Sequence, residues 1–399
     1  MKLSKLSITS QWKNLEGFSV EFNNDRDIVV LLGKNGSAKS NLLETIIKIF
    51  RDIDLKESSP FSYSLEYILD GALVNIETEV DKQPKAKVNN KSISSSELRA
   101  NWFPRYIVGY YSGASDRFEE LFKVHDKAAL KGTLHEIKPG EKLAFRRFIC
   151  ARPVHGLFAL LAFYLFQDDE IESFLGDFPR IEAFDSALLI LKKPEWAKKD
   201  ADPETFWGAK GPVGDLLKNI KSHSMAPFTR SIMLSTDFRH RETSQLYYLH
   251  LPDLNSLHSL SSDYGNDPKA FFQALDTMRL SELIYDFRVR VKVKGANNSI
   301  HTRQLSEGEQ QLLTVIGLMR FTQDENSLYI LDEPDTHLNP AWGLDYLSRL
   351  RNIGGINKNS HTILATHDPL LVAGLLKEEI KVLSRSDSGK VSAIEPEES

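Results

Sequence analysis

The alternation of apolar and polar residues divides the chain into strand-like and helix-like segments. Residues 6–22 alternate with a period of two, which predicts paired antiparallel strands. Residues 27–32 are almost continuously apolar, as in a buried strand, and further strands are expected at 65–80, 105–111 and 287–293. After a glycine-rich loop that follows residue 32, apolar residues recur with helical spacing at Leu42, Leu43, Ile46, Ile47 and Phe50.

These elements predict an α/β fold in three segments. Residues 1–112 and 286–399 carry the strands and adjoining helices, so together they are expected to form a mixed sheet with flanking helices. Residues 113–285 mix helical stretches with turns, and we expect them to form an inserted, mainly helical domain. A length of 399 residues allows two or three domains of ordinary size.

Composition and charge exclude several classes of protein. Net charge is −5, so no basic field over the whole chain favours nucleic acid. The single cysteine, Cys150, excludes an internal disulfide and is consistent with a cytoplasmic protein. The longest apolar run, Leu157–Phe166, is far shorter than the roughly 20 residues that span a bilayer, so it predicts a buried helix and no membrane contact.

The glycine-rich loop contains the first candidate chemistry. Backbone amides of such a loop converge on phosphates, a lysine neutralises charge on the β- and γ-phosphates, and a hydroxyl binds Mg²⁺. The pattern G-x-x-x-x-G-K-[ST] assigns the last two roles to Lys39 and Ser40. Ala38 replaces the second glycine, and its methyl group is expected to crowd the β-phosphate. The predicted ATP-binding residues of the loop are Gly33, Lys34, Asn35, Gly36, Ser37, Ala38, Lys39 and Ser40.

A glycine-rich turn with a chance lysine is the alternative interpretation of this loop. The strand before it and the helix after it favour nucleotide binding.

A second predicted strand, Leu328–Leu331, ends in two adjacent carboxylates. We assign Asp332, with Ser40, to Mg²⁺, and Glu333 to activation of the attacking water. Acidic residues after a strand are common, so this pair is informative only together with the loop. The strand Thr362–Thr366 ends in His367; a single histidine in this position is more often structural.

The segment Leu305–Gln310 reads Leu-Ser-Glu-Gly-Glu-Gln, and Ser306 with Glu309 has the spacing of a helix capping box. The segment also resembles the ABC ATPase signature in the variant of RecF, SMC and OLD-type heads. That resemblance implies an ABC-type P-loop ATPase head, in which Ser306 and Gly308 contact the γ-phosphate held by another protomer. It therefore implies a homodimer or a higher even-numbered oligomer.

Other segments extend this resemblance. Lys39–Glu44 is similar to the loop-to-helix junction of the same branch, which brings Asn41 to the site. By resemblance, His367 senses the γ-phosphate. The family often has a Mg²⁺-binding glutamine after the strand 105–111, where this chain has tyrosines and a serine, so Tyr111 or Ser112 is expected to line the site.

The segment between the head halves is of intermediate length and has no heptads. With Leu331–Trp342 and Ala365–Leu370, it resembles ATPases of bacterial anti-phage systems, such as Septu-like and restriction-associated AAA-type ATPases. The resemblance implies an ATP- and Mg²⁺-dependent switch that controls a separate effector, expected to be a nuclease. About thirty residues follow His367, so we expect the nuclease to be a separate protein.

Two other functions stay open. One is a slow or non-hydrolysing scaffold gated by nucleotide, which Ala38 favours, and the other is a DNA-repair or DNA-maintenance ATPase. DNA contact would need a basic surface. One candidate is the cluster Arg146, Arg147, Arg152 and His155, and another is the alternating set Arg288, Arg290, Lys292 and Lys294; both are also typical of solvated faces. Residues 239–241, also basic, are expected to form a loop.

Overall fold

A computed structural model describes residues 1–133, 146–165, 168–177, 179–235, 241–323, 326–356, 359–387 and 389–396. The chain divides into two compact units. Unit 1 comprises Met1–Val124, Arg146–Arg152 and Leu318–Ser399, and unit 2 comprises His125–Phe145 and Pro153–Gly317. This division differs from the predicted domains, because residues 286–317 belong to unit 2. The predicted domain limits therefore stay a prediction.

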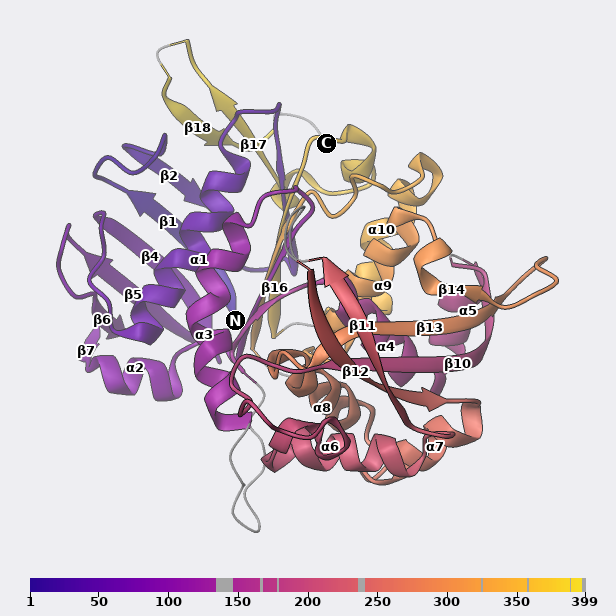
Figure 1. Ribbon diagram of the computed structural model, residues 1–399. Coiled ribbons are helices and arrows are strands. Elements are labelled where there is room, and N and C mark those ends of the chain that lie inside the picture. Colours follow the sequence, from indigo (N-terminus) through magenta and orange to yellow (C-terminus); the bar gives the residue numbers. More distant parts are fainter. Residues whose placement is uncertain are drawn as a thin grey trace. The chain divides into compact units, whose positions relative to one another are not determined.

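Unit 1 contains a six-stranded antiparallel sheet with the order β2-β1-β4-β5-β6-β7 (Figure 1). Leu6 of the first strand pairs with Val20 of the second and with Leu65 of the fourth, so the predicted antiparallel pairing within residues 6–22 is confirmed. The strands are β1 (Lys2–Ile8), β2 (Phe18–Glu21), β4 (Tyr63–Leu69), β5 (Ala72–Thr78), β6 (Lys85–Val88) and β7 (Lys91–Ile93).

A seven-stranded, mostly parallel sheet in the same unit has the order β18-β17-β3-β16-β15-β8-β9. The strands β3, β16, β15 and β8 are parallel neighbours, so their carboxyl ends lie at one edge of the sheet, where ligands of open α/β sheets bind. The strands are β3 (Ile28–Leu32), β8 (Tyr106–Tyr111), β9 (Phe148–Cys150), β15 (Ser327–Asp332), β16 (Ser360–Thr366), β17 (Ile380–Arg385) and β18 (Val391–Ile394).

Helix α1 (Lys39–Leu55) begins directly after the glycine-rich loop, as predicted. Its apolar positions Leu42, Leu43, Ile46, Ile47 and Phe50 are fully buried and join a hydrophobic core with both sheets of unit 1. The other helices that lie wholly or partly in unit 1 are α2 (Ser95–Asn101), α3 (Arg117–Thr133), α9 (Glu307–Arg320) and α10 (Pro340–Asn352), with short 3-10 turns at Pro369–Val372 and Lys377–Glu379.

Unit 2 combines helices with a five-stranded sheet of order β11-β12-β10-β13-β14. The strands are β10 (Ile181–Lys192), β11 (Phe228–Ser235), β12 (Arg241–Leu251), β13 (Ile284–Val293) and β14 (Ile300–His301). The helices are α4 (Pro153–Leu165), α5 (Asp169–Asp177), α6 (Gly211–Ser222), α7 (Leu254–Ser262) and α8 (Pro268–Leu280), with 3-10 turns at Pro203–Gly208 and Thr302–Gln304. Residues 113–285 thus contain the expected helices, but sequence analysis did not place the long strands β10, β11 and β12.

The described structure is α/β, with sheets and flanking helices, as predicted. Helix α4 is buried over most of its length, as expected for the apolar run that begins at Leu157. Phe166, at the end of that run, lies outside the described residues, as do residues 239 and 240 of the predicted loop. Among the described helices, none combines the length and the apolar character needed to cross a membrane.

Candidate functional site

The loop Gly33–Ser40 connects β3 to α1 at the carboxyl edge of the parallel sheet. Gly33 packs so tightly that a Cβ atom there would lie 2.6 Å from the carbonyl oxygen of Leu383. Gly36 has a φ of 83° and Ala38 a φ of 78°, so both lie in the left-handed region. Ala38 therefore keeps the backbone shape that the usual glycine provides, at a steric cost of about 1–2 kcal/mol.

Lys39 is held against the loop that precedes it. Its Nζ donates to the carbonyl oxygen of Gly33 at 2.6 Å and to that of Lys34 at 3.3 Å. Burial lowers the pKa of Lys39, while the nearby carboxylates of Glu333, Asp332 and Asp335 raise it. The ammonium group thus lies among loop carbonyls and acidic side chains, ready to exchange one of these contacts for a phosphate.

Asp332 ends β15 and is almost fully buried. In the described residues, neither carboxylate oxygen has a hydrogen-bond partner of normal geometry. The pKa of Asp332 is raised to about 6: burial is the largest cause, the nearby Ser40 hydroxyl lowers the pKa and Glu333 raises it. A buried carboxylate without partners is costly unless a cation or a strong donor accompanies it. Asp332 and Ser40 supply the oxygen ligands that Mg²⁺ prefers, so these residues fit the ion.

Glu333 follows at the turn after β15 with a φ of 49°, in the left-handed region. Its amide donates to the carbonyl oxygen of Ala365, which fixes the turn to β16. Its Oε1 lies 3.2 Å from Nδ1 of His367, and its Oε2 accepts from the hydroxyl of Thr336 at 3.5 Å. The structure therefore brings the predicted water-activating carboxylate and the predicted sensor histidine into contact.

Asp335, which sequence analysis did not single out, supports the His367 segment. The Thr366 hydroxyl donates to Oδ2 of Asp335 at 2.5 Å and accepts from the amide of Asp368 at 2.9 Å. Burial raises the pKa of Asp335, and the hydrogen bond from Thr366 opposes that rise. The only sequence signal for this role is the position of Asp335 soon after the acidic pair.

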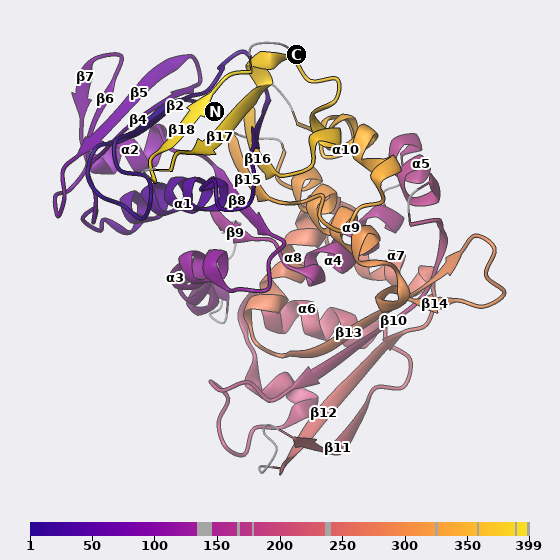
Figure 2. The ribbon, with the colours of Figure 1, turned by 90° about the horizontal axis from the view of Figure 1, so that it is seen from above.

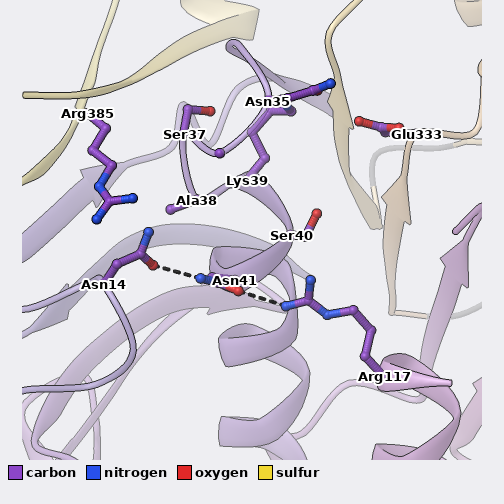
Figure 3. Close-up of a pocket in the computed structure, with 11 residues that line it drawn as sticks. Asn14, Asn35, Ser37, Ala38, Lys39, Ser40, Asn41, Arg117, Glu333 and Arg385 are labelled. Atoms are coloured by element: carbon purple, nitrogen blue, oxygen red, sulfur yellow. Dashed lines mark hydrogen bonds between the residues drawn. The ribbon is translucent and has the colours of Figure 1, made fainter. Parts of the chain in front are cut away.

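A cavity of about 510 Å³ opens in front of the loop (Figure 3). Its walls include the predicted residues 35–41 and Glu333. Gly33, Lys34, Asp332 and His367 do not line the cavity. The carbonyl oxygens of Gly33 and Lys34 accept from Lys39, Asp332 lies near Ser40, and His367 contacts Glu333.

Three further lining residues, Asn14, Arg117 and Arg385, were missed by sequence analysis. Arg117 at the start of α3 donates to Oδ1 of Asn41 at 2.7 Å and to Oε2 of Glu44 at 3.0 Å. The side-chain amide of Asn41 in turn donates to Oδ1 of Asn14 at 2.7 Å. Figure 3 shows these residues in a row along one wall. They come from three segments far apart in sequence, so no local motif reveals them.

Tyr111 and Ser112 lie at the end of β8, level with Asp332, but neither lines the cavity. Tyr111 stacks on Phe118 with ring centroids 5.3 Å apart, and the Arg117 guanidinium lies over its ring. Ser112 donates its amide to the carbonyl oxygen of Asp332 at 3.2 Å. Both residues therefore lie beside the end of β15 and not in the cavity wall.

The segment with Ser306 and Gly308 belongs to unit 2. The exposed Ser306 donates its amide and its hydroxyl to Oε2 of Glu309, at 2.7 and 2.8 Å. The Glu309 amide donates back to the Ser306 hydroxyl at 3.3 Å, which completes the predicted capping box. Gly308 is buried in the first turn of α9.

The basic cluster near residue 150 is held by internal contacts. Arg147 pairs with Asp54 at 2.8 Å, Arg152 pairs with Glu119 at 3.2 Å, and the fully buried His155 lies 2.9 Å from Asp276. His155 is therefore a core residue, which corrects the interpretation of this cluster as a solvated face. In the part of the chain that the structure describes, no group of three or more His, Cys, Asp or Glu side chains is arranged to hold a metal ion.

Comparison with known proteins gives one relative of known name and a set of solved structures with weak likeness. The Septu protein PtuA of Bacillus mycoides (strain KBAB4) is 28% identical over 139 residues, which cover 32% of this chain and 19% of that protein. The match thus spans about a fifth of the relative's length. The SMC head domain from Thermotoga maritima aligns over 100% of both chains with a TM-score of 0.42 and 12% identity. The recombination mediator RecF bound to ATPγS aligns over 98% of both chains, with a TM-score of 0.37 and 14% identity. At these scores the likeness carries no further conclusion.

A protein family model described as "AAA domain, putative AbiEii toxin, Type IV TA system" matches residues 165–373, a little over half of the chain. The matched region contains Ser306, the Asp332–Glu333 pair and His367. The chain therefore belongs to this AAA domain family.

Proposed function

We propose that the chain binds ATP with Mg²⁺ in the cavity of unit 1 and hydrolyses the ATP to ADP and phosphate. The observation that carries this proposal is the buried carboxylate of Asp332, which has no hydrogen-bond partner in the described residues and lies beside Ser40 at the end of a phosphate-binding loop. A site that leaves such a group unpaired is preorganised for a cation.

Each group of the site has a defined role in this reaction. The loop amides and Lys39 hold the β- and γ-phosphates, and Ser40 and Asp332 hold Mg²⁺, which when bound neutralises phosphate charge. Glu333 orients the attacking water and accepts its proton as the water oxygen bonds to the γ-phosphorus and the bond to the β,γ-bridging oxygen breaks. His367, which contacts Glu333, would sense the γ-phosphate.

The same proposal includes pairing of two heads around ATP. Ser306 and Gly308 of one copy would contact the γ-phosphate bound by Lys39 of the other, so ATP binding closes a homodimer or a higher even-numbered oligomer. We further propose that this closure switches a separate effector, a nuclease, in cytoplasmic anti-phage defence. The similarity to a Septu protein, which covers 32% of this chain, supports this role.

Phosphate release by the purified chain tests the activity. Glu333→Gln keeps the shape and the charge-free contacts of the side chain but removes the base, so turnover should fall by about 10²- to 10⁴-fold while ATP still binds. Lys39→Ala should lose binding and turnover together. Phosphate release that is equal in wild type and Glu333→Gln would contradict the assignment of Glu333.

A nucleotide-gated scaffold is the second candidate function, and the left-handed Ala38 favours it. If its methyl group holds the β-phosphate away from the loop, ATP should drive dimerisation without phosphate release. Size-exclusion chromatography with light scattering, with ATP and with ADP, separates the two functions when combined with the phosphate assay. A DNA-repair ATPase, in contrast, would show turnover stimulated by DNA.

A further inference from the structure

The sheet of unit 2 carries its helices on one face. Figure 2 shows α4, α6, α7 and α8 on one side of the strands β10 to β13. Side chains from these helices meet Leu189, Leu249 and Phe287 of the strands around a small apolar cavity. Because side chains alternate along a strand, the residues between these point to the opposite face, which we call the outer face. Its residues used below are Phe228, Tyr248, His250, Arg288, Arg290 and Lys292.

Strand register makes the outer face continuous. Phe228 of β11 pairs with Tyr248 of β12. Two residues further along, His250 and Arg288 both pair with Leu188 of the strand between them. Arg290 is next along β13, opposite Ser186. The aromatic side chains of β11 and β12 and the basic side chains of β13 therefore lie on the same face, on either side of β10.

The aromatic part of the outer face is a stacked pair in contact with water. The rings of Phe228 and Tyr248 have centroids 4.6 Å apart and an interplanar angle of 4°. Phe228 is 52% exposed although it is a large apolar residue in a strand. An exposed ring in such a stack offers a flat apolar surface on which another planar group gains contact area.

The basic part of the outer face lies on β13. The side chains of Arg288 and Arg290 are 46% and 49% exposed, and Lys292 is also exposed. Asp286 pairs with both Arg288 and Arg303, and Asp185 lies 3.7 Å from Arg290, so two carboxylates face four cations when Lys292 is included. Burial and then the charge of Arg303 lower the pKa of His301 on the neighbouring strand; Arg288 and Arg290 lower it too, and Asp286 opposes them. The local field along β13 is thus positive, although the whole chain carries a net charge of −5.

We propose that the outer face binds single-stranded nucleic acid, with bases stacked on Phe228 and Tyr248 and phosphates bound by Arg288, Arg290 and Lys292. Exposed rings stack unpaired bases, and basic side chains beside them hold the backbone, which together favour a single strand over a duplex. The strands β12 and β13 are two positions apart in the sheet, a separation of about 10 Å. About three stacked nucleotides span that distance. The site needs no ATP, so it is independent of the proposed ATPase activity.

Fluorescence anisotropy of the full chain with labelled oligothymidine, oligouridine and a blunt duplex of equal length tests the proposal. Wild type should bind the single strands more tightly than the duplex. Phe228→Ala should weaken single-strand binding by about tenfold or more, because each stacked base contributes that much. Arg290→Ala should lower the slope of log affinity against log salt by about one phosphate contact.

Matched controls come from the same unit. Tyr285 is 42% exposed at the irregular pairing near the start of β13, and Lys218 has a 68% exposed side chain on α6. Tyr285→Ala and Lys218→Ala should bind like wild type. Unfolding curves verify that the variants fold; if Phe228→Ala does not, the salt slope of Arg290→Ala decides.

Three results would overturn the proposal: wild type that binds no oligonucleotide, a duplex bound as tightly as the single strands, or outer-face variants that bind like the controls. If oligonucleotides do not bind and Phe228→Ala changes the oligomeric state of the chain, the outer face is a protein interface and the proposal is wrong.

Discussion

Two segments of this chain are assigned to the same phosphate group, yet their structures differ. The loop Gly33–Ser40 encloses a cavity and has a buried lysine, and an acid without partners lies behind it. The turn around Ser306 is exposed, and its donors are already satisfied by Glu309. The first segment lies beside a buried acid that a magnesium–nucleotide complex would pair, whereas the hydrogen-bond donors of the second already have partners within the turn.

The difference indicates how the two segments would act. A preorganised site with an unpaired buried acid binds its ligand with little rearrangement beyond the exchange of one Lys39 contact, so the loop should determine affinity. A satisfied capping box has to exchange its own hydrogen bonds for a phosphate, so the turn around Ser306 should respond only after a ligand is held elsewhere. Separate measurements of ATP affinity and of ATP-dependent dimerisation test this difference between the two segments.

The largest expected effect separates the two segments directly. Lys39→Ala should weaken ATP binding by several hundredfold, about 3–4 kcal/mol, because it removes a partly buried charge partner of the phosphates. Ser306→Ala should leave the ATP affinity of the dilute chain within about twofold. Titration with a fluorescent ATP analogue measures both, and Lys87→Ala, an exposed lysine of β6, is the control.

Ser306→Ala should also fail to dimerise with ATP, although it still binds ATP. Loss of affinity in Ser306→Ala, or retention of affinity in Lys39→Ala, would reverse the roles assigned to the two segments.

A somewhat smaller effect concerns Asp332. Its pKa is raised from 3.8 to about 6 in the folded chain, so the folded state holds a proton that the unfolded state has lost between these values. The stability contribution of this group therefore falls as pH rises through that window and stays low above it. Without Mg²⁺ or nucleotide, Asp332→Asn should be more stable than wild type above pH 6, by up to about 3 kcal/mol.

Urea unfolding across this pH window measures the difference, which should shrink toward acid. Asp335→Asn is the comparison: burial also raises the pKa of that carboxylate, but the hydrogen bond from Thr366 opposes the rise, so the gain should have the same direction and be smaller. A stability difference between Asp332→Asn and wild type that does not change with pH would mean that the carboxylate is not desolvated as the structure has it.

The smallest expected effect lies in the loop itself. Ala38→Gly should stabilise the chain by about 0.5–1 kcal/mol, since relief of the left-handed strain exceeds the added entropy of the unfolded chain. Gly36→Ala is the mirror control: its φ is 83° and an added Cβ would meet no atom within 4 Å, so its cost of about 1 kcal/mol is backbone strain alone. Thermal unfolding measures both.

Phosphate release by Ala38→Gly and by wild type tests whether the methyl group of Ala38 limits turnover. If Ala38→Gly also raises phosphate release, the methyl group limits catalysis; if release stays at zero in both proteins, the scaffold function gains support.

Local patterns predicted the elements that carry the site. The apolar run before Gly33 predicted β3, the spacing from Leu42 to Phe50 predicted α1, and the run before Asp332 predicted β15; the structure has all three. The capping box of Ser306 and Glu309 was likewise predicted from its spacing. In each case the information lies within a few consecutive residues.

Sequence analysis predicted β13 of the sheet of unit 2 but missed β10, β11 and β12. Strands β10 and β12 lie centrally in the sheet, and both contain apolar residues on each face, so their alternation is weak. Such runs are easily confused with buried helix. The stacked pair of Phe228 and Tyr248 depends on pairing between two strands, which neither segment reveals alone.

The sequence by itself determined which residues of this protein we assign to phosphate, because the loop, the acidic pair and the histidine each need a fixed order of side chains at the end of one strand. Tertiary structure alone decided how these groups interact: that both oxygens of Asp332 are buried without partners, that Glu333 meets His367, and that Arg117 and Asn14 reach Asn41. Contacts between distant segments depend on how the strands and helices pack, and the desolvation that shifts a pKa depends on every neighbour at once.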